Sequence, residues 1–65
     1  MINLLYCIDE NYNEQLFTSL TSITNKVKNK LNVYIVHENP TSFIEYENKI
    51  NSNSKVNFLE VIKFN

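Results

Sequence analysis

Three short apolar segments, separated by two segments of helical periodicity, are the feature of this 65-residue sequence that most limits its fold. The first, Ile2–Ile8, is almost continuously apolar and short, which favours a buried strand over a helix. Asn32–His37 and Val56–Ile62 are rich in β-branched and aromatic residues, which are typical of strands. Strands that alternate with helices in this way indicate a parallel sheet.

The segment after the first strand has the pattern of an amphipathic helix. Asn13 is in position to act as the N-cap, with Glu14 in the first turn. Apolar residues then recur at helical spacing, with Phe17 beside them: Leu16, Leu20, Ile23 and Val27. Lysines gather at the end of this segment, where cations suit the helix dipole: Lys26, Lys28 and Lys30.

A second, shorter helix is predicted between the second and third strands. Asn39 and Pro40 break the chain after the second strand. Ser42 and Glu45 have the spacing of a capping box, which predicts the start of the helix. The residues expected to share one helix face are Phe43, Tyr46, Glu47 and Ile50. Asn51–Ser54 follows as a loop of turn-forming residues.

The predicted fold is α/β: a single partial domain over residues 1–65 with a Rossmann-like β-α-β-α-β order and three parallel strands. Because crossovers are right-handed, we expect the strand order 3-2-1 and both helices on one face. The first strand is apolar on both sides, with Ile2, Leu4, Tyr6 and Ile8 on one and Leu5 and Cys7 on the other.

A parallel sheet with helices on one face alone is incomplete, because such sheets normally have both faces covered. The chain is therefore expected to be the front part of a larger fold or to pair with another copy of itself. As a 65-residue chain it is expected to be a homo-oligomer, most simply a two-fold dimer that buries the first strand and the helix-free face.

Composition excludes several classes of protein. One cysteine, Cys7, and one histidine allow neither an internal disulfide nor a zinc finger. The net charge of −1 and the absence of arginine argue against a nucleic-acid partner. The absence of glycine excludes the glycine-dependent phosphate loops. No apolar run is long enough for a membrane span, and no secretory signal opens the chain, so a cytoplasmic location is expected.

The candidate ligand site follows the first strand. Ligands of open α/β sheets bind beyond the carboxyl ends of the strands, here residues 7–12, residues 37–39 and Lys63 onward. Tyr12 could stack on a base, and Asp9 and Asn11 could hydrogen-bond a base edge or a ribose. The same spacing also suits a structural role, in which Asp9 and Asn11 cap the next helix and Tyr12 packs on it.

Residues 2–12, which end in Asp9-Glu10-Asn11-Tyr12, resemble the start of glycosyltransferase family 8. Members of this family open with an apolar strand, a D-D/E-N-Y loop and a helix with an S-[LIV]-x-S-[LIV] pattern. Ser19-Leu20-Thr21-Ser22-Ile23 is similar to that pattern, and residues 32–42 and 56–61 are similar to the next two family segments. The resemblance covers the whole chain, which corresponds to roughly the first quarter of a family catalytic domain.

The resemblance implies the nucleotide-diphospho-sugar transferase (GT-A) fold and a UDP-sugar donor, whose hexose is transferred to a glycan or lipid-glycan acceptor. It also assigns four nucleotide-binding residues. The position of Cys7 lies against the uracil through its backbone, and those of Asp9 and Asn11 hydrogen-bond the base or ribose. The position of Tyr12 stacks on the base.

The resemblance places the family's divalent metal, usually manganese, on a D-x-D motif after a later strand. This chain has one aspartate, Asp9, so it lacks that motif and is expected to be inactive alone. Glu45-Tyr46-Glu47 has a similar spacing, but alternate residues point ~200° apart around a helix, so a solvated face is expected. His37 is expected to make a structural hydrogen bond. The alternatives are a stand-alone, non-catalytic, self-associating α/β domain, or a small α/β binding or regulatory module.

Overall fold

A computed structural model of the chain describes residues 1–64. The elements follow one another as β1 (Ile2–Ile8), a 3-10 helix (Glu10–Tyr12), α1 (Asn13–Lys26), β2 (Leu31–His37), a 3-10 helix (Pro40–Phe43), α2 (Ile44–Asn51) and β3 (Val56–Lys63). The expected β-α-β-α-β order is thus confirmed, and the strand boundaries agree with the sequence pattern to within one residue.

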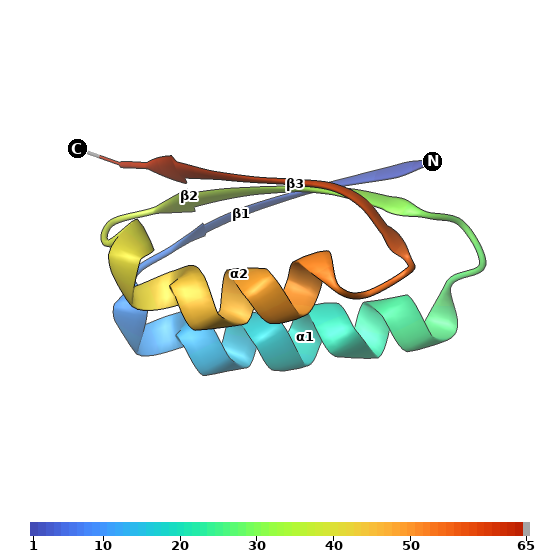
Figure 1. Cartoon of the computed structure of the whole chain (residues 1–65), viewed down its shortest axis with the longest axis horizontal. Helices are drawn as coiled ribbons and strands as arrows, with labels where there is room; N and C mark the ends of the chain where they lie inside the picture. Colours follow the sequence, from blue (N-terminus) through green and yellow to red (C-terminus); the bar gives the residue numbers. More distant parts are fainter. Residues whose placement is uncertain (65) are drawn as a thin grey trace.

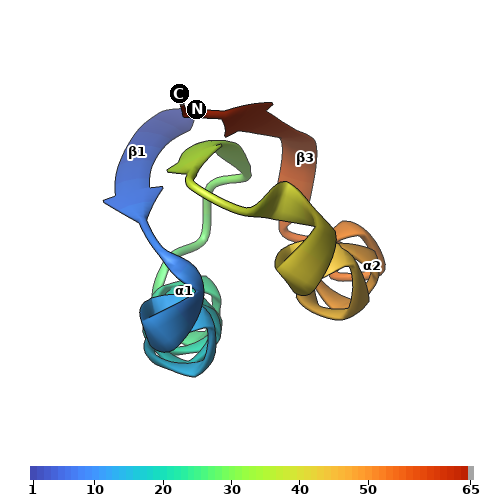
Figure 2. The same cartoon turned by 90° about the vertical axis from the view of Figure 1, so that its left-hand side faces the viewer.

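The three strands form one parallel sheet in the order β1-β2-β3, as predicted. Ile2 lies opposite Leu31 in the β1–β2 register, and Ile8 lies opposite His37. A bulge at the start of β3 leaves Asn57 without a partner in the β2 register. Both helices lie on the same face of the sheet, and within residues 1–64 the other face is uncovered (Figures 1 and 2).

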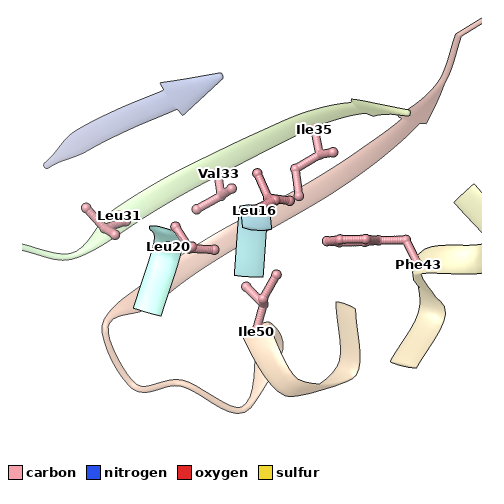
Figure 3. Packing of buried hydrophobic residues seen from close by; sticks show 7 residues of the cluster. All are labelled: Leu16, Leu20, Leu31, Val33, Ile35, Phe43 and Ile50. Carbon is pink, nitrogen blue, oxygen red and sulfur yellow. The ribbon is translucent and has the colours of Figure 1, made fainter. Parts of the chain in front are cut away.

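The hydrophobic core lies between β2 and the two helices. Leu31, Val33 and Ile35 alternate along β2 and are fully buried, because β2 is the central strand. Side chains from both helical segments point into the same space (Figure 3): Leu16, Leu20, Phe43 and Ile50. Leu16, Leu20 and Ile23 of the predicted stripe therefore pack against the sheet, as helical periodicity requires. The helix ends at Lys26, so Val27 of the stripe packs from beyond it, and the expectation that Lys28 and Lys30 belong to its last turn is wrong.

The predicted N-cap of the first helix is wrong. Asn13 is the first residue of α1, and the capping position belongs to Tyr12, whose side chain makes no capping hydrogen bond. Asp9 instead caps the preceding 3-10 helix, because its Oδ1 accepts a hydrogen bond from the Asn11 backbone N–H at 2.9 Å. The side chain of Asn13 is directed into the fold, where it contacts β2 and the connection from β2 to β3, which we call the second crossover.

The predicted capping box is also wrong. Ser42 lies in the 3-10 helix before α2, and its Oγ donates a hydrogen bond to the Asn39 carbonyl at 2.7 Å. Glu45 is exposed and pairs with Lys49 one turn further along, at 3.9 Å. Phe43 takes the capping position of α2 without a side-chain hydrogen bond, and its ring is fully buried.

Two polar contacts join the loop between α2 and β3 to the end of α1, near the amino-terminal end of the sheet. Asn53 Nδ2 donates to the buried Thr24 Oγ1 at 3.2 Å, which links the loop after α2 to α1. Lys55 Nζ donates to the Val27 carbonyl at 2.6 Å, just beyond the end of α1. These bonds provide partners for polar groups that burial would otherwise leave unsatisfied.

The uncovered face is mixed in character, with polar as well as apolar side chains. Side chains on it include Asn3, Leu5, Cys7, Asn32, Tyr34, Val36, Phe58, Glu60 and Ile62. At the amino-terminal end Asn57 Nδ2 donates to Asn32 Oδ1 at 3.1 Å, and Asn32 Nδ2 donates to Asn3 Oδ1 at 3.0 Å. A row of amides therefore crosses all three strands, with Phe58 beside it in β3 and further apolar side chains towards the carboxyl ends.

None of the helices within residues 1–64 has the length and apolar character that crossing a membrane requires.

Candidate functional site

A hollow of about 320 Å³ lies at the carboxyl ends of β1 and β2. It is lined by Cys7, Ile8, Asp9, Tyr12, Val36, Glu38 and Phe64. Its place agrees with the expected one, because both strands end here and the chain leaves β3 at the same edge. Three of the four predicted nucleotide-binding residues thus come together in one depression.

Two aromatic rings line this hollow and stay accessible. Tyr12 is 55% exposed and Phe64 is 63% exposed, although both are large and apolar. Exposed rings at the wall of a depression offer stacking surfaces for a flat ligand, and base–aromatic stacking contributes about 1–3 kcal/mol. The sequence pattern identifies Tyr12, whereas Phe64 could have been found only from its place just after the third strand.

Asp9 has a structural role that still leaves room for a ligand. Its Oδ1 accepts the Asn11 backbone N–H at 2.9 Å, and its carbonyl accepts the Tyr12 N–H at 3.1 Å. A carboxylate has two oxygens, so the capping and ligand-binding interpretations of Asp9 are compatible.

The structure leaves Asn11 outside the hollow. Its side chain is exposed, and Asn11 is absent from the residues that line the depression. Cys7 lines the hollow from the uncovered face of the sheet, where it is exposed. Of the predicted set, Cys7, Asp9 and Tyr12 are therefore brought together, and Asn11 lies next to them along the chain.

The charge at this edge is mainly negative. Asp9 and Glu38 line the hollow, and Glu10 follows Asp9 on the exposed surface. Such a site suits an uncharged base or ribose better than a bare diphosphate. Within residues 1–64 no group of three or more His, Cys, Asp or Glu side chains could hold a metal ion.

His37 lies behind the hollow as a structural residue. It is fully buried, and its Nδ1 accepts the Asn39 backbone N–H at 2.8 Å. Because Nδ1 accepts, the ring proton of the neutral form lies on Nε2, which donates to Asn13 Oδ1 at 2.6 Å. Asn13 Nδ2 then donates to Ser42 Oγ at 3.2 Å. The expected structural hydrogen bond of His37 is confirmed. Together the hydrogen bonds of His37 and Asn13 join β2, α1 and the second crossover.

Burial lowers the pKa of His37 below its usual value of 6.5. The carboxylates of Asp9, Glu10 and Glu38 act in the opposite direction, but desolvation is the larger effect. The lowered pKa favours the neutral ring. The hydrogen bonds agree, because a backbone N–H donates to Nδ1, which must then carry no proton.

A second hollow, of about 340 Å³, lies beside β1 and above α1. It is lined by Tyr6, Cys7, Ile8, Tyr12, Gln15 and Leu16. Cys7, Ile8 and Tyr12 border both hollows.

No protein-family model, curated protein or solved structure matches this chain. The similarity to glycosyltransferase family 8 therefore stays a prediction that rests on the residues quoted above.

Proposed function

We propose that this chain is the nucleotide-binding front of a glycosyltransferase similar to family 8, and that its hollow takes the uridine of a UDP-sugar. One observation carries this proposal: Cys7, Asp9 and Tyr12, which the resemblance assigns to the nucleotide, line one hollow at the carboxyl edge of the sheet. The parent enzyme would have the GT-A fold and transfer a hexose to a glycan or lipid-glycan acceptor.

Each residue has a role that its chemistry supports. The exposed ring of Tyr12 stacks on the uracil, and the backbone of Cys7 borders the base. The second oxygen of Asp9 accepts a hydrogen bond from a ribose hydroxyl, while Asn11 contacts the nucleotide from its exposed position.

The acidic character of the edge indicates what the rest of such an enzyme has to supply. The diphosphate would sit near Asp9, Glu10 and Glu38, so its charge requires a divalent metal held by later residues. Manganese is the ion that the resemblance implies. The 65-residue chain alone is therefore proposed to bind nucleotide weakly and to transfer no sugar.

The sheet leaves room for the rest of a larger domain. In doubly wound sheets of order 3-2-1-4 the fourth strand pairs with the first. Within residues 1–64 nothing lies beside the outer edge of β1, and one face of the sheet is uncovered (Figure 2). Both features are what the front part of a GT-A domain would present to its own continuation.

Replacing Tyr12 with alanine should weaken UDP binding. Wild-type binding is expected at a Kd of about 1 mM or weaker, because diphosphate and metal contacts are missing. Loss of stacking would weaken it at least ~5-fold, at about 1–3 kcal/mol per base. Phe58→Ala is the matched control, since Phe58 is an exposed ring that does not line the hollow. Titration followed by NMR tests this, and equal binding by Tyr12→Ala and the wild type would refute the role of Tyr12.

A second candidate function is a stand-alone, non-catalytic domain that associates with itself. The outer edge of β1 favours it, because this uncharged edge has the properties of a pairing surface.

A further inference from the structure

The two edges of the sheet differ in how they are protected against pairing. Proteins protect exposed strand edges with charges, prolines and bulges. β3 has a bulge at Asn57 and carries Glu60 and Lys63. β1 has no charged residue and no proline from Ile2 to Ile8, and its ladder with β2 is regular. Figure 2 shows the outer side of β1 uncovered, so β1 is the unprotected edge.

Hydrogen bonds to β2 show which β1 residues have backbone groups that point outward. The Ile2 N–H donates to the Lys30 carbonyl at 3.1 Å, and the Ile8 carbonyl accepts the Glu38 N–H at 3.3 Å. Since backbone groups alternate in direction along a strand, even-numbered residues of β1 face β2. Asn3, Leu5 and Cys7 therefore present their N–H and C=O groups to the outer edge.

We propose that two copies of this chain pair through β1 in antiparallel orientation, with the two-fold axis at Leu5. In this register Leu5 faces Leu5 of the second copy, and Asn3 faces Cys7 in both directions. All three outward residues then lie in hydrogen-bonded pairs, whereas a shift by two residues either way leaves one of them unpaired. The result is one continuous sheet with the helices of both copies on one face.

Side chains on the helix face agree with this register. Ile2 of one copy lies opposite Ile8 of the other, and Leu4 lies opposite Tyr6, so apolar residues meet apolar residues. The hollow beside β1, lined in part by Tyr6 and Ile8, lies where Ile2 of the second copy would enter. The dimer thus fills a space that is open in the single chain.

The flank of α1 beside this edge is uncharged from Gln15 to Ser22, and Lys26 continues the same line at the end of the helix. Gln15 lines the hollow, and Ser19 and Ser22 follow it at helical spacing and are exposed. These side chains are uncharged, and those of Ser19 and Ser22 are short, so the α1 helices of two copies could approach under the joined sheet. This pairing occupies the edge that a fourth strand of a larger domain would take, and it shares Cys7 with the proposed nucleotide site, so it applies to the 65-residue chain alone; sedimentation without nucleotide tests it separately from UDP binding.

Opposite charges at Leu5 test the register directly. Leu5 is 69% exposed, so Leu5→Lys and Leu5→Glu should both keep the fold, as circular dichroism would show. In sedimentation at tens of micromolar, we expect a wild-type dimer and a monomer for each variant alone, because like charges lie directly opposite. An equimolar mixture of the two variants should form dimers again. Ile62→Lys, on the uncovered face of β3, should remain dimeric.

Cysteine cross-linking provides a second, independent measurement. With Asn3→Cys, the new thiol should form a disulfide with Cys7 of the second copy, since hydrogen-bonded antiparallel pairs have Cα atoms about 5.5 Å apart. Residues 3 and 7 of one strand are ~13 Å apart and cannot be bridged within a copy. Asn57→Cys, at the far edge, should give no link to Cys7. A monomeric wild type, or a mixture of the two Leu5 variants that stays monomeric, would overturn the proposal. A disulfide between the two Cys7 residues, in place of the expected link from residue 3 to Cys7, would also overturn it.

Discussion

Replacing Phe43 with alanine should leave most of the chain unfolded at room temperature. Phe43 is fully buried and packs against His37 and Tyr46, with ring centroids 5.4 Å and 5.6 Å apart. Truncating a buried phenylalanine costs about 3–5 kcal/mol. A domain of this length has a total free energy of unfolding of about 3–10 kcal/mol. The loss is therefore comparable to the whole stability of the fold.

Ile44→Ala is the matched control for this experiment. Ile44 is the next residue, begins α2 and is 50% exposed, so its truncation should cost well under about 1 kcal/mol. Urea denaturation followed by circular dichroism compares the two variants with the wild type. Similar midpoints for Phe43→Ala and Ile44→Ala would show that the core does not depend on the second crossover.

Acidification below about pH 6.5 should destabilise the fold through His37. Its folded pKa is lowered by burial, so the unfolded chain binds the proton more readily than the folded one. The stability from the neutral ring is complete above the unfolded pKa and is lost as the pH falls towards the folded pKa. The free energy of unfolding should fall by up to about 1.4 kcal/mol per pH unit over this range.

The titration of His37 can be followed directly, because the chain has one histidine. Its imidazole NMR signals should shift with a midpoint below 6.5, and the nitrogen shifts above that midpoint should show the proton on Nε2. A midpoint at or above 6.5 would contradict the desolvated environment and the hydrogen bond from the Asn39 N–H to Nδ1.

Much of the fold could be predicted from the sequence because burial leaves a periodic signal. The apolar run of Ile2–Ile8 identified a strand, but its expected burial is wrong for the single chain, because β1 is an edge strand whose residues alternate between half-buried and exposed. The spacing of Leu16 and Leu20 identified the buried face of α1. Right-handed crossovers then leave one strand order for a chain that winds in one direction.

The errors have a common physical cause. Asn13 and Ser42 fit helix-capping patterns, yet their side chains hydrogen-bond each other across 29 residues of chain, and that of Asn13 also bonds His37 across 24. A short polar side chain suits a cap and a buried network equally well, and only the tertiary structure decides between them. The amide row of Asn3, Asn32 and Asn57 is also a tertiary feature, because its residues come from three strands and Asn57 lies at the bulge in β3.

The sequence predicted where the candidate site lies better than it predicted which residues line it. Asp9 and Tyr12 follow from the rule that ligands bind at the carboxyl ends of parallel strands, whereas the ligand role of Cys7 comes from the family resemblance alone. Val36 and Phe64 also line this hollow, because β2 ends and the chain leaves β3 at the same edge of the sheet. No sequence motif marks either residue. Asn11 lies in the 3-10 helix, is exposed and does not line the hollow, so its expected contact with a ligand stays a prediction.

Amide shifts on titration with UDP, compared with ADP, test the central claim most directly. The account predicts that UDP moves the signals of residues 9–12 and of Val36 and Glu38, while the far end around Asn53 stays unchanged. ADP should move the same signals less, and adding manganese should change little, since residues 1–64 hold no metal-binding group. Equal shifts with both nucleotides, or shifts centred at the amino-terminal end of the sheet, would contradict a uridine site in this hollow.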